Sequence, residues 1–209
     1  MASSVILSPH LDDAVFDCWH ALANGATVLN VFAAKPPEGT HTFWDRVCGE
    51  ADSRRMFQIR IDENEAAVAM SGTKKTQLYL DYMDAQYRSS HPTASELADA
   101  IERKTPKGTF YAPLAISLVF RHKDHVLLRQ AALELHKRGH AVGFYPDAPY
   151  MNPPHTPRPA SLKRLHARAE KVLGLPLRTD IHELSPKALQ AKDAAMHAYQ
   201  SQYKMTNLE

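Results

Sequence analysis

Short apolar segments alternate with longer, more charged segments along most of this 209-residue chain, and the alternation restricts the folds open to it. The apolar segments are typical of buried strands, and the others carry the spacing of helices. Parallel strands need crossover connections, which are usually helical. We therefore predict a Rossmann-like, doubly wound α/β fold, with a mostly parallel sheet covered by helices on both faces, as one domain over residues 1–209. The expected strands are residues 5–7, 27–32, 77–80, 109–112, 141–145 and 177–181, and the expected helices are residues 14–23, 50–70, 95–103, 125–137 and 187–199.

The C-terminal third of the chain contains two further local signals. Ser185 and Pro186 are typical of the N-cap and first turn of a helix. One face of that helix is expected to pack on the sheet through Leu189, Met196, Tyr199 and Tyr203. Residues 146–159 contain six prolines, which exclude a regular helix or a central strand. We expect a surface loop there, either a lid that faces a substrate or a poorly ordered segment.

Composition narrows the classes of partner. The 25 Lys and Arg residues nearly balance the 23 Asp and Glu residues without forming a basic block, so a small molecule is favoured over nucleic acid. Cys18 and Cys48 are the only cysteines, which excludes a disulfide framework and an all-cysteine zinc site. The first apolar run is too short for a signal peptide or a membrane span, so a cytoplasmic location is expected.

Two clusters of His and Asp follow expected strands. One is Pro9-His10-Leu11-Asp12-Asp13, after the first strand, and the other is Arg121-His122-Lys123-Asp124-His125, reached from the fourth. Ligands of open α/β sheets bind beyond the C-terminal ends of the strands, so the two clusters are expected to meet. A catalytic zinc ion takes three nitrogen or oxygen ligands and leaves one position open. Together the clusters favour such a site.

These two motifs, together with Arg60-Ile-Asp-Glu63 between them, resemble the PIG-L/LmbE-like family of zinc-dependent N-acetylglucosaminyl deacetylases. The resemblance runs along the whole chain, and the paired motifs are fairly specific to that family. It implies that His10, Asp13 and His125 bind Zn²⁺, although Fe²⁺ or another divalent metal suits the same ligands. It also implies that Asp12 is the general base and that His122 supports the tetrahedral intermediate.

Each of these residues also has a purely structural alternative. Asp124 would orient a histidine through its carboxylate, or it would only cap the helix that starts near His125. Asp12 or Asp13 would likewise serve as the N-cap of the first helix if it had no catalytic part. Arg60 is a candidate substrate contact, but it would otherwise form a solvated pair with Glu63 one helical turn away.

The segment after the third expected strand offers two more candidate substrate contacts. Asp84 would bind sugar hydroxyls and Arg88 an anionic group, unless this loop only shields the site. Two positions depart from the family pattern. Ala14 stands where many relatives have Glu, so the loop must be held in another way. Phe120 stands where some thiol-sugar deacetylases have Tyr, so no phenol donor is available there.

The resemblance leads to a functional hypothesis. The chain is expected to be a zinc-dependent amidohydrolase that removes acetyl from an N-acetylated amino sugar, free or within a glycoconjugate such as an antibiotic precursor. A second hypothesis keeps the site but makes the substrate another amide, for example a thiol-sugar conjugate. A third, a non-catalytic signalling module, is disfavoured because Tyr145-Pro146-Asp147 follows the fifth strand where receiver domains need Lys. The oligomeric state stays open, with a homo-oligomer one option.

Overall fold

A five-stranded sheet forms the centre of the protein in this computed structural model, which describes residues 3–72, 77–116, 122–147 and 159–203. The strand order is β3-β2-β1-β4-β5, and every neighbouring pair is parallel. β1 therefore lies in the middle, paired with β2 through Val5↔Thr27 and with β4 through Val5↔Phe110. The strands are β1 (Ser3–Ser8), β2 (Thr27–Asn30), β3 (Gln77–Tyr79), β4 (Gly108–Pro113) and β5 (Ala141–Tyr145).

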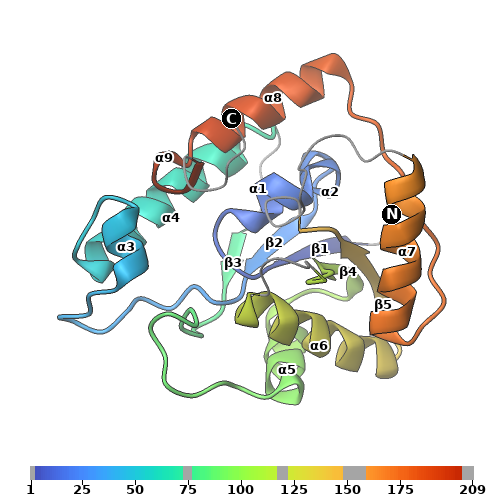
Figure 1. The fold of residues 1–209 in the computed structure, drawn as a ribbon, viewed down its shortest axis with the longest axis horizontal. Coiled ribbons are helices and arrows are strands. Elements are labelled where there is room, and N and C mark those ends of the chain that lie inside the picture. Colours follow the sequence, from blue (N-terminus) through green and yellow to red (C-terminus); the bar gives the residue numbers. More distant parts are fainter. Residues whose placement is uncertain (1–2, 73–76, 117–121, 148–158, 204–209) are drawn as a thin grey trace.

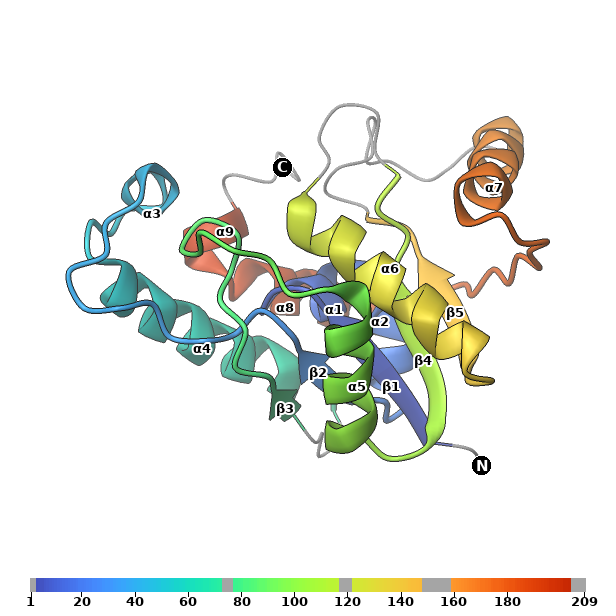
Figure 2. The same ribbon diagram turned by 90° about the horizontal axis from the view of Figure 1, so that it is seen from below.

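Helices cover both faces of this sheet, as the sequence predicted. α5 (Ala94–Lys104) and α6 (Lys123–Lys137) lie on one face, and Figure 2 views the sheet from their side. α1 (Asp13–Asp17), α2 (Trp19–Ala23), α4 (Ser53–Ala69) and α8 (Pro186–His197) lie on the other. The remaining described helices are α3 (Phe43–Val47), α7 (Pro159–Leu173) and the short α9 (Gln200–Tyr203). Together with the parallel sheet, the two helical layers confirm the predicted α/β class.

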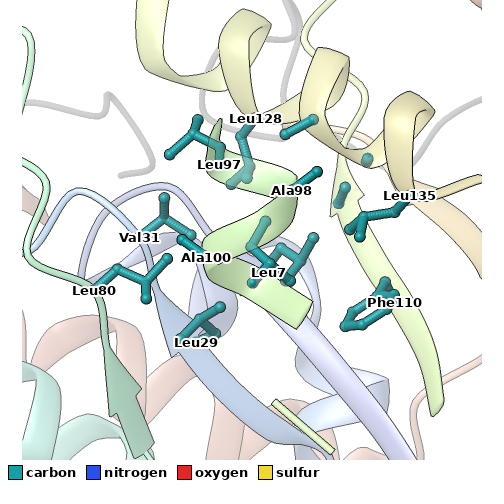
Figure 3. Close-up of a cluster of buried hydrophobic side chains, with 14 of the residues drawn as sticks. Leu7, Leu29, Val31, Leu80, Leu97, Ala98, Ala100, Phe110, Leu128 and Leu135 are labelled. Atoms are coloured by element: carbon teal, nitrogen blue, oxygen red, sulfur yellow. The ribbon is translucent and has the colours of Figure 1, made fainter. Parts of the chain in front are cut away.

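The hydrophobic core explains why the strands are so uniformly apolar. Figure 3 shows the cluster between the sheet and the helices α5 and α6, where Leu7, Leu29 and Phe110 of the strands meet Leu97 and Leu128. A second cluster on the opposite face contains Ile6 and Val28, the neighbours of Leu7 and Leu29 in the chain. Because successive strand residues point to opposite faces and both faces are covered, nearly every position must be apolar.

One glycine is needed where β1 and β4 approach closely. A Cβ atom added to Gly108 would lie 1.9 Å from the carbonyl oxygen of Ser3. A backbone atom cannot move away at low cost, so a larger residue would push the two central strands apart. The β1–β4 pairing therefore requires glycine at position 108. The relative position of the two His/Asp clusters depends on this pairing.

Several details of the predicted elements are wrong. Residues 177–181 do not form a strand, because Leu177 packs in a small cluster with α7 while Ile181 stays 67% exposed. The expected helix at residues 14–23 is interrupted at Cys18, whose backbone leaves the helical region. Neither α3 nor α7 was expected. Of the proline-rich segment, residues 148–158 lie outside the described part of the chain.

The last long helix begins as predicted but packs differently. The side chain of Ser185 accepts a hydrogen bond from the amide of Ala188 at 3.2 Å, and Pro186 occupies the first turn. α8 packs mainly against α1 and α4, and Tyr199 beyond it joins the core cluster on that face of the sheet. Leu189 was expected in this contact but is 57% exposed. Among the described residues, no helix has both the length and the apolar character that crossing a membrane requires.

We expect the core contact of α6 to dominate the stability of this face. Leu128→Ala removes a fully buried side chain and should lower the free energy of unfolding by about 2–5 kcal/mol. Leu189→Ala makes the same chemical change at an exposed helical position and should change it by less than about 0.5 kcal/mol. Urea denaturation followed by circular dichroism measures both. Equal losses in the two variants would contradict the described packing.

Candidate active site

The polar residues of interest gather where the parallel strands end. His10 and Asp12 lie between the end of β1 and the start of α1, and Asp13 is the first residue of α1. His122 and His125 lie at the first turn of α6, in the connection that leaves β4. Because β1 and β4 are adjacent and parallel, their C-terminal ends lie at the same edge of the sheet. This topology brings together two clusters that are more than 100 residues apart.

Three imidazole rings meet at this edge. The ring centroids lie 4.5 Å apart for His10 and His122, 5.3 Å for His10 and His125, and 5.2 Å for His122 and His125. One nitrogen of each ring lies within 4.8 Å of the others, close enough for a shared cation. A carboxylate oxygen of Asp84 and one of Asp124 form a second such group with His10.

Asp13 adds a carboxylate to the histidine group. Its Oδ2 lies 3.4 Å from Nε2 of His125 and 3.5 Å from Nδ1 of His10, and it accepts a hydrogen bond from the backbone amide of His10 at 2.8 Å. Burial raises the pKa of Asp13, but the facing His125 and His10 outweigh it and lower that pKa to about 2. Asp13 is therefore an anion at neutral pH, as a metal ligand must be.

Asp12 has the opposite electrostatic character, although it is the next residue in the chain. Burial, and then the neighbouring charge of Asp13, raise its pKa above the usual value. Asp12 occupies the N-cap position of α1 but makes no side-chain capping hydrogen bond, so the capping alternative is wrong for it. Asp12 instead lines a pocket that also contains His10 and Arg60.

The N-cap of α6 is His122, so the alternative in which Asp124 only caps this helix is wrong. A ring nitrogen of His122, Nδ1, accepts a hydrogen bond from the backbone amide of Asp124 at 3.4 Å. Burial lowers the pKa of His122 to about 3, and the nearby His10 and His125 contribute. His122 is therefore a neutral imidazole at pH 7 in this structure, and an acceptor at Nδ1 leaves Nε2 as the protonated nitrogen.

Asp124 is fully buried and joins three parts of the protein. Its carboxylate lies 3.1 Å from Nε2 of His10, accepts the amide of Ala85 at 2.9 Å and forms an ion pair with Arg88. Burial raises the pKa of Asp124, but the hydrogen bonds from His10 and Arg88 reverse the effect and lower it. The predicted contact between this carboxylate and a histidine is therefore present.

Arg60 and Asp84 lie in the pocket beside His10 and Asp12, whereas Arg88 does not line it. Arg60 donates to the Oε1 atom of Gln202 at 2.7 Å, and its guanidinium lies 3.9 Å from Asp84. The alternative in which Arg60 forms a solvated pair with Glu63 is wrong, because Glu63 instead accepts hydrogen bonds from Ser201. The guanidinium of Arg88 packs over the ring of Phe32 at 4.7 Å, with its side chain only 5% exposed.

The loop that carries His10 and Asp12 is held by groups that the sequence did not single out for this purpose. Ser8 donates to the carbonyl of His10 at 2.6 Å and accepts the amide of Ala14 at 3.0 Å. The phenol of Tyr199 reaches the carbonyl of Leu11 at 3.1 Å. These contacts anchor the loop without the Glu that Ala14 replaces. Phe120 lies outside the described residues.

Sequence reasoning missed Asp147 as a site residue. Its Oδ1 lies 2.6 Å from Nδ1 of His125, and its Oδ2 accepts the backbone amide of Ala115 at 2.6 Å. The signal was available, because Asp147 comes two residues after β5 and thus at the same edge of the sheet as both clusters. It stands alone in a proline-rich stretch, so no local pattern pointed to it.

The buried pair of Arg88 and Asp124 leads to a stability prediction. Arg88→Met leaves the Asp124 carboxylate without its cation, and the free energy of unfolding should fall by about 3–5 kcal/mol at pH 7. Arg55→Met removes a largely exposed partner of Glu50 and should lower the free energy of unfolding much less. Denaturant titrations of the three proteins measure these losses. Similar losses in both variants would show that the buried ion pair contributes no more to stability than the exposed one.

The contribution of the Arg88–Asp124 pair to the free energy of unfolding should depend on pH in a defined direction. The pKa of Asp124 is lowered in the folded protein, so its stabilisation is complete above the ordinary Asp value and is lost as the pH falls through the lowered one. The difference between wild type and Arg88→Met should therefore shrink in acid. Repeating the titrations from pH 7 to the lowest pH at which both proteins still fold, below pH 3, tests this, and a constant difference contradicts it.

Comparison with known proteins places this geometry in context. No protein-family model and no curated protein sequence matches the chain. Solved structures do match. A triple mutant of the deacetylase Orf2 of the teicoplanin biosynthetic pathway shares 25% identity at a TM-score of 0.71, covering 99% of this chain and 84% of that one. The zinc-inhibited form of teicoplanin deacetylase Orf2 aligns at the same TM-score with 21% identity, covering 99% and 87%.

Two other solved structures show how widely the fold is used. Dbv21, the A40926 pseudoaglycone deacetylase, shares 22% identity at a TM-score of 0.68 and covers 99% of this chain and 85% of its own. GalB, the 4-carboxy-2-hydroxymuconate hydratase from Pseudomonas putida, shares 19% identity at a TM-score of 0.53, covering 98% and 83%. The deacetylase matches span almost the whole chain. Together with the paired motifs, they establish that this protein has the fold of the LmbE-like deacetylases.

Proposed function

We propose that this protein is a zinc-dependent N-deacetylase that hydrolyses the acetamide of an N-acetylated amino sugar within a glycoside. The observation that carries the proposal is the convergence of three imidazoles and the Asp13 carboxylate beside a pocket that contains Asp12. Imidazole and carboxylate donors suit Zn²⁺, and they also suit Fe²⁺. Orf2, whose fold this chain shares, has been solved in a form described as zinc-inhibited, so zinc acts on that deacetylase.

In this proposal His10, Asp13 and His125 hold the metal. The donor set fits, because the carboxylate of Asp13 lies within 3.5 Å of a nitrogen of both His10 and His125. A bound zinc ion would supply a Lewis acid that polarises the amide carbonyl and lowers the pKa of water. The remaining steps of amide hydrolysis, which move protons and stabilise charge, fall to residues of the chain.

Asp12 is the proposed general base. A base is most effective when its pKa approaches the working pH, and burial with the adjacent Asp13 charge shifts the pKa of Asp12 in that direction. The two neighbouring carboxyl groups thus have pKa values on either side of the ordinary Asp value. Such a separation fits one carboxylate that stays ionised as a ligand and one that exchanges a proton.

His122 is the proposed donor to the developing oxyanion. Because Nδ1 accepts the amide of Asp124, Nε2 carries the proton and is the nitrogen that would donate to the oxyanion. One well-placed donor of this kind contributes on the order of 3 kcal/mol to transition-state stabilisation. The supporting part of Asp124 in this scheme is to hold His10 through its 3.1 Å contact. Arg88 holds Asp124, and any contact of Arg88 with substrate stays a prediction.

The pocket next to the histidines is the proposed sugar site. Arg60 and Asp84 offer a donor and an acceptor for hydroxyl groups, and Phe57 and Tyr87 offer apolar surface for a sugar ring. The glycopeptide context of Orf2 and Dbv21 favours a substrate with a bulky aglycone. GalB shows that the same fold also hosts a hydratase, so the assay must separate acetate release from the addition of water to a double bond.

Asp12→Asn should lower turnover by about 100- to 10,000-fold, because it removes a base without removing a ligand. The assay follows acetate release from N-acetylglucosamine glycosides with small and bulky aglycones, and metal content is measured by mass spectrometry. Zinc content should equal that of wild type. Asp62→Asn, the same change at an exposed position of α4, should behave as wild type in both measurements. Near-normal turnover in Asp12→Asn would exclude this base.

Removal of the metal should abolish acetate release, and stoichiometric Zn²⁺ should restore it. His125→Ala should lose tightly bound zinc, whereas His122→Ala should keep most of it and lose turnover. Dialysis against a chelator, followed by zinc titration with a fluorescent competitor, compares the three proteins. If His122→Ala lost zinc as completely as His125→Ala, the two histidines would exchange roles. A wild type that takes up no zinc would refute the proposed function.

A further inference from the structure

Asp147 makes two short contacts from a buried position behind the metal site. The residue is only 4% exposed, and its partner His125 is only 1% exposed. Oδ1 lies 2.6 Å from Nδ1 of His125, and Oδ2 accepts the amide of Ala115 at the same distance. Asp147 does not line the pocket that contains Asp12 and Arg60. Any effect on the chemistry must therefore pass through its two partners, His125 and Ala115.

The opposite edge of the His125 ring faces the site. Nε2 lies 3.4 Å from Oδ2 of Asp13, and the ring is one of the three converging imidazoles. An imidazole that donates its Nδ1 proton to a carboxylate carries its lone pair on Nε2. The contact with Asp147 thus decides which nitrogen can act as a metal ligand.

The second contact of Asp147 fixes the position of the carboxylate itself. Ala115 has a φ of 49°, a left-handed conformation that is uncommon for a residue with a side chain. Its amide points to Oδ2 of Asp147, while its carbonyl accepts a hydrogen bond from Arg129 at 2.8 Å. The turn after β4 and the segment after β5 are therefore tied to each other directly behind His125.

We propose that Asp147 is the positioning residue of the metal site, which keeps the proton of His125 on Nδ1 and directs Nε2 toward Asp13 and His10. The inference rests on the proposed function for its consequence, which is zinc affinity. Its structural content, the position of one proton, does not depend on any metal. Carboxylates that hold metal-ligating histidines in this way commonly affect metal affinity by about 10- to 100-fold.

The test compares wild type with Asp147→Asn, which keeps the size of the side chain. If the amide oxygen of Asn remains on Ala115, its NH₂ group faces Nδ1 of His125 and can only donate. The proton of His125 must then move to Nε2, where it opposes metal binding. We expect long-range ¹⁵N–¹H correlation spectra of the zinc-free, ¹⁵N-histidine-labelled protein near pH 9 to show the Nδ1-H form in wild type and the Nε2-H form in Asp147→Asn. The His125 signals are identified by their absence from His125→Gln.

Zinc affinity is the second measurement, and Arg129→Met is the matched control. That variant removes the hydrogen bonds from Arg129 to the carbonyls of Leu114 and Ala115 and keeps the carboxylate of Asp147, so it should lower the melting temperature but leave the tautomer and the zinc affinity unchanged. Asp147→Asn should weaken zinc binding by about 10- to 100-fold. An equal loss of zinc affinity in Arg129→Met would show that Asp147 only stabilises the turn at Ala115. That result would overturn the proposal.

The wild-type spectrum keeps the proposal falsifiable even if Asp147→Asn does not fold. An Nε2-H tautomer in wild type overturns it directly, and so does an unchanged tautomer in a folded Asp147→Asn. A wild type that has the Nδ1-H form but binds no zinc distinguishes the claim about the proton of His125 from the claim about the deacetylase function. In that case the position assigned to the proton stands and the proposed deacetylase function fails.

Discussion

The parallel pairing of β1 with β4 is the constraint on which the candidate site depends. Two neighbouring parallel strands must end at the same edge of the sheet, so the segments that follow them meet there whatever their separation in the chain. Residues 10–13 and 122–125 lie on these two segments. Gly108 keeps the two strands at pairing distance, because any side chain there would meet the backbone of Ser3. The chemistry at the edge is thus a consequence of strand order.

The charged groups at this edge are arranged to tolerate burial. An isolated buried charge is costly, and each carboxylate here has a cation or several donors within reach. Asp124 is paired with Arg88 and contacts His10, and Asp13 faces two histidines. The result is a set of side chains whose orientations are fixed before any ligand arrives. Preorganised groups of this kind lose little free energy to reorganisation during a reaction.

The alternation of apolar and charged segments was sufficient to predict the sheet, because parallel strands covered on both faces produce continuous apolar runs. The motifs predicted that His10, Asp13 and His125 lie together. Features that depend on single tertiary contacts were not predictable. Asp147 acts alone after β5, and the real N-cap of α6, His122, competes with an Asp that has the higher capping preference. Residues 177–181 have strand-like composition but find no strand to pair with.

The contact between Tyr199 and the carbonyl of Leu11 spans 188 positions of the chain and has a consequence for biosynthesis. Arg60 is likewise engaged by Gln202, from 142 positions away. During translation the sheet can assemble from N-terminal segments as they emerge, but the loop that carries Asp12 lacks its last anchor until residues 199–202 leave the ribosome. A nascent chain that stops earlier would hold His10 and Asp12 on a loop without this support. The loop that carries Asp12 therefore cannot reach its final anchored form before residues 199–202 have been synthesised.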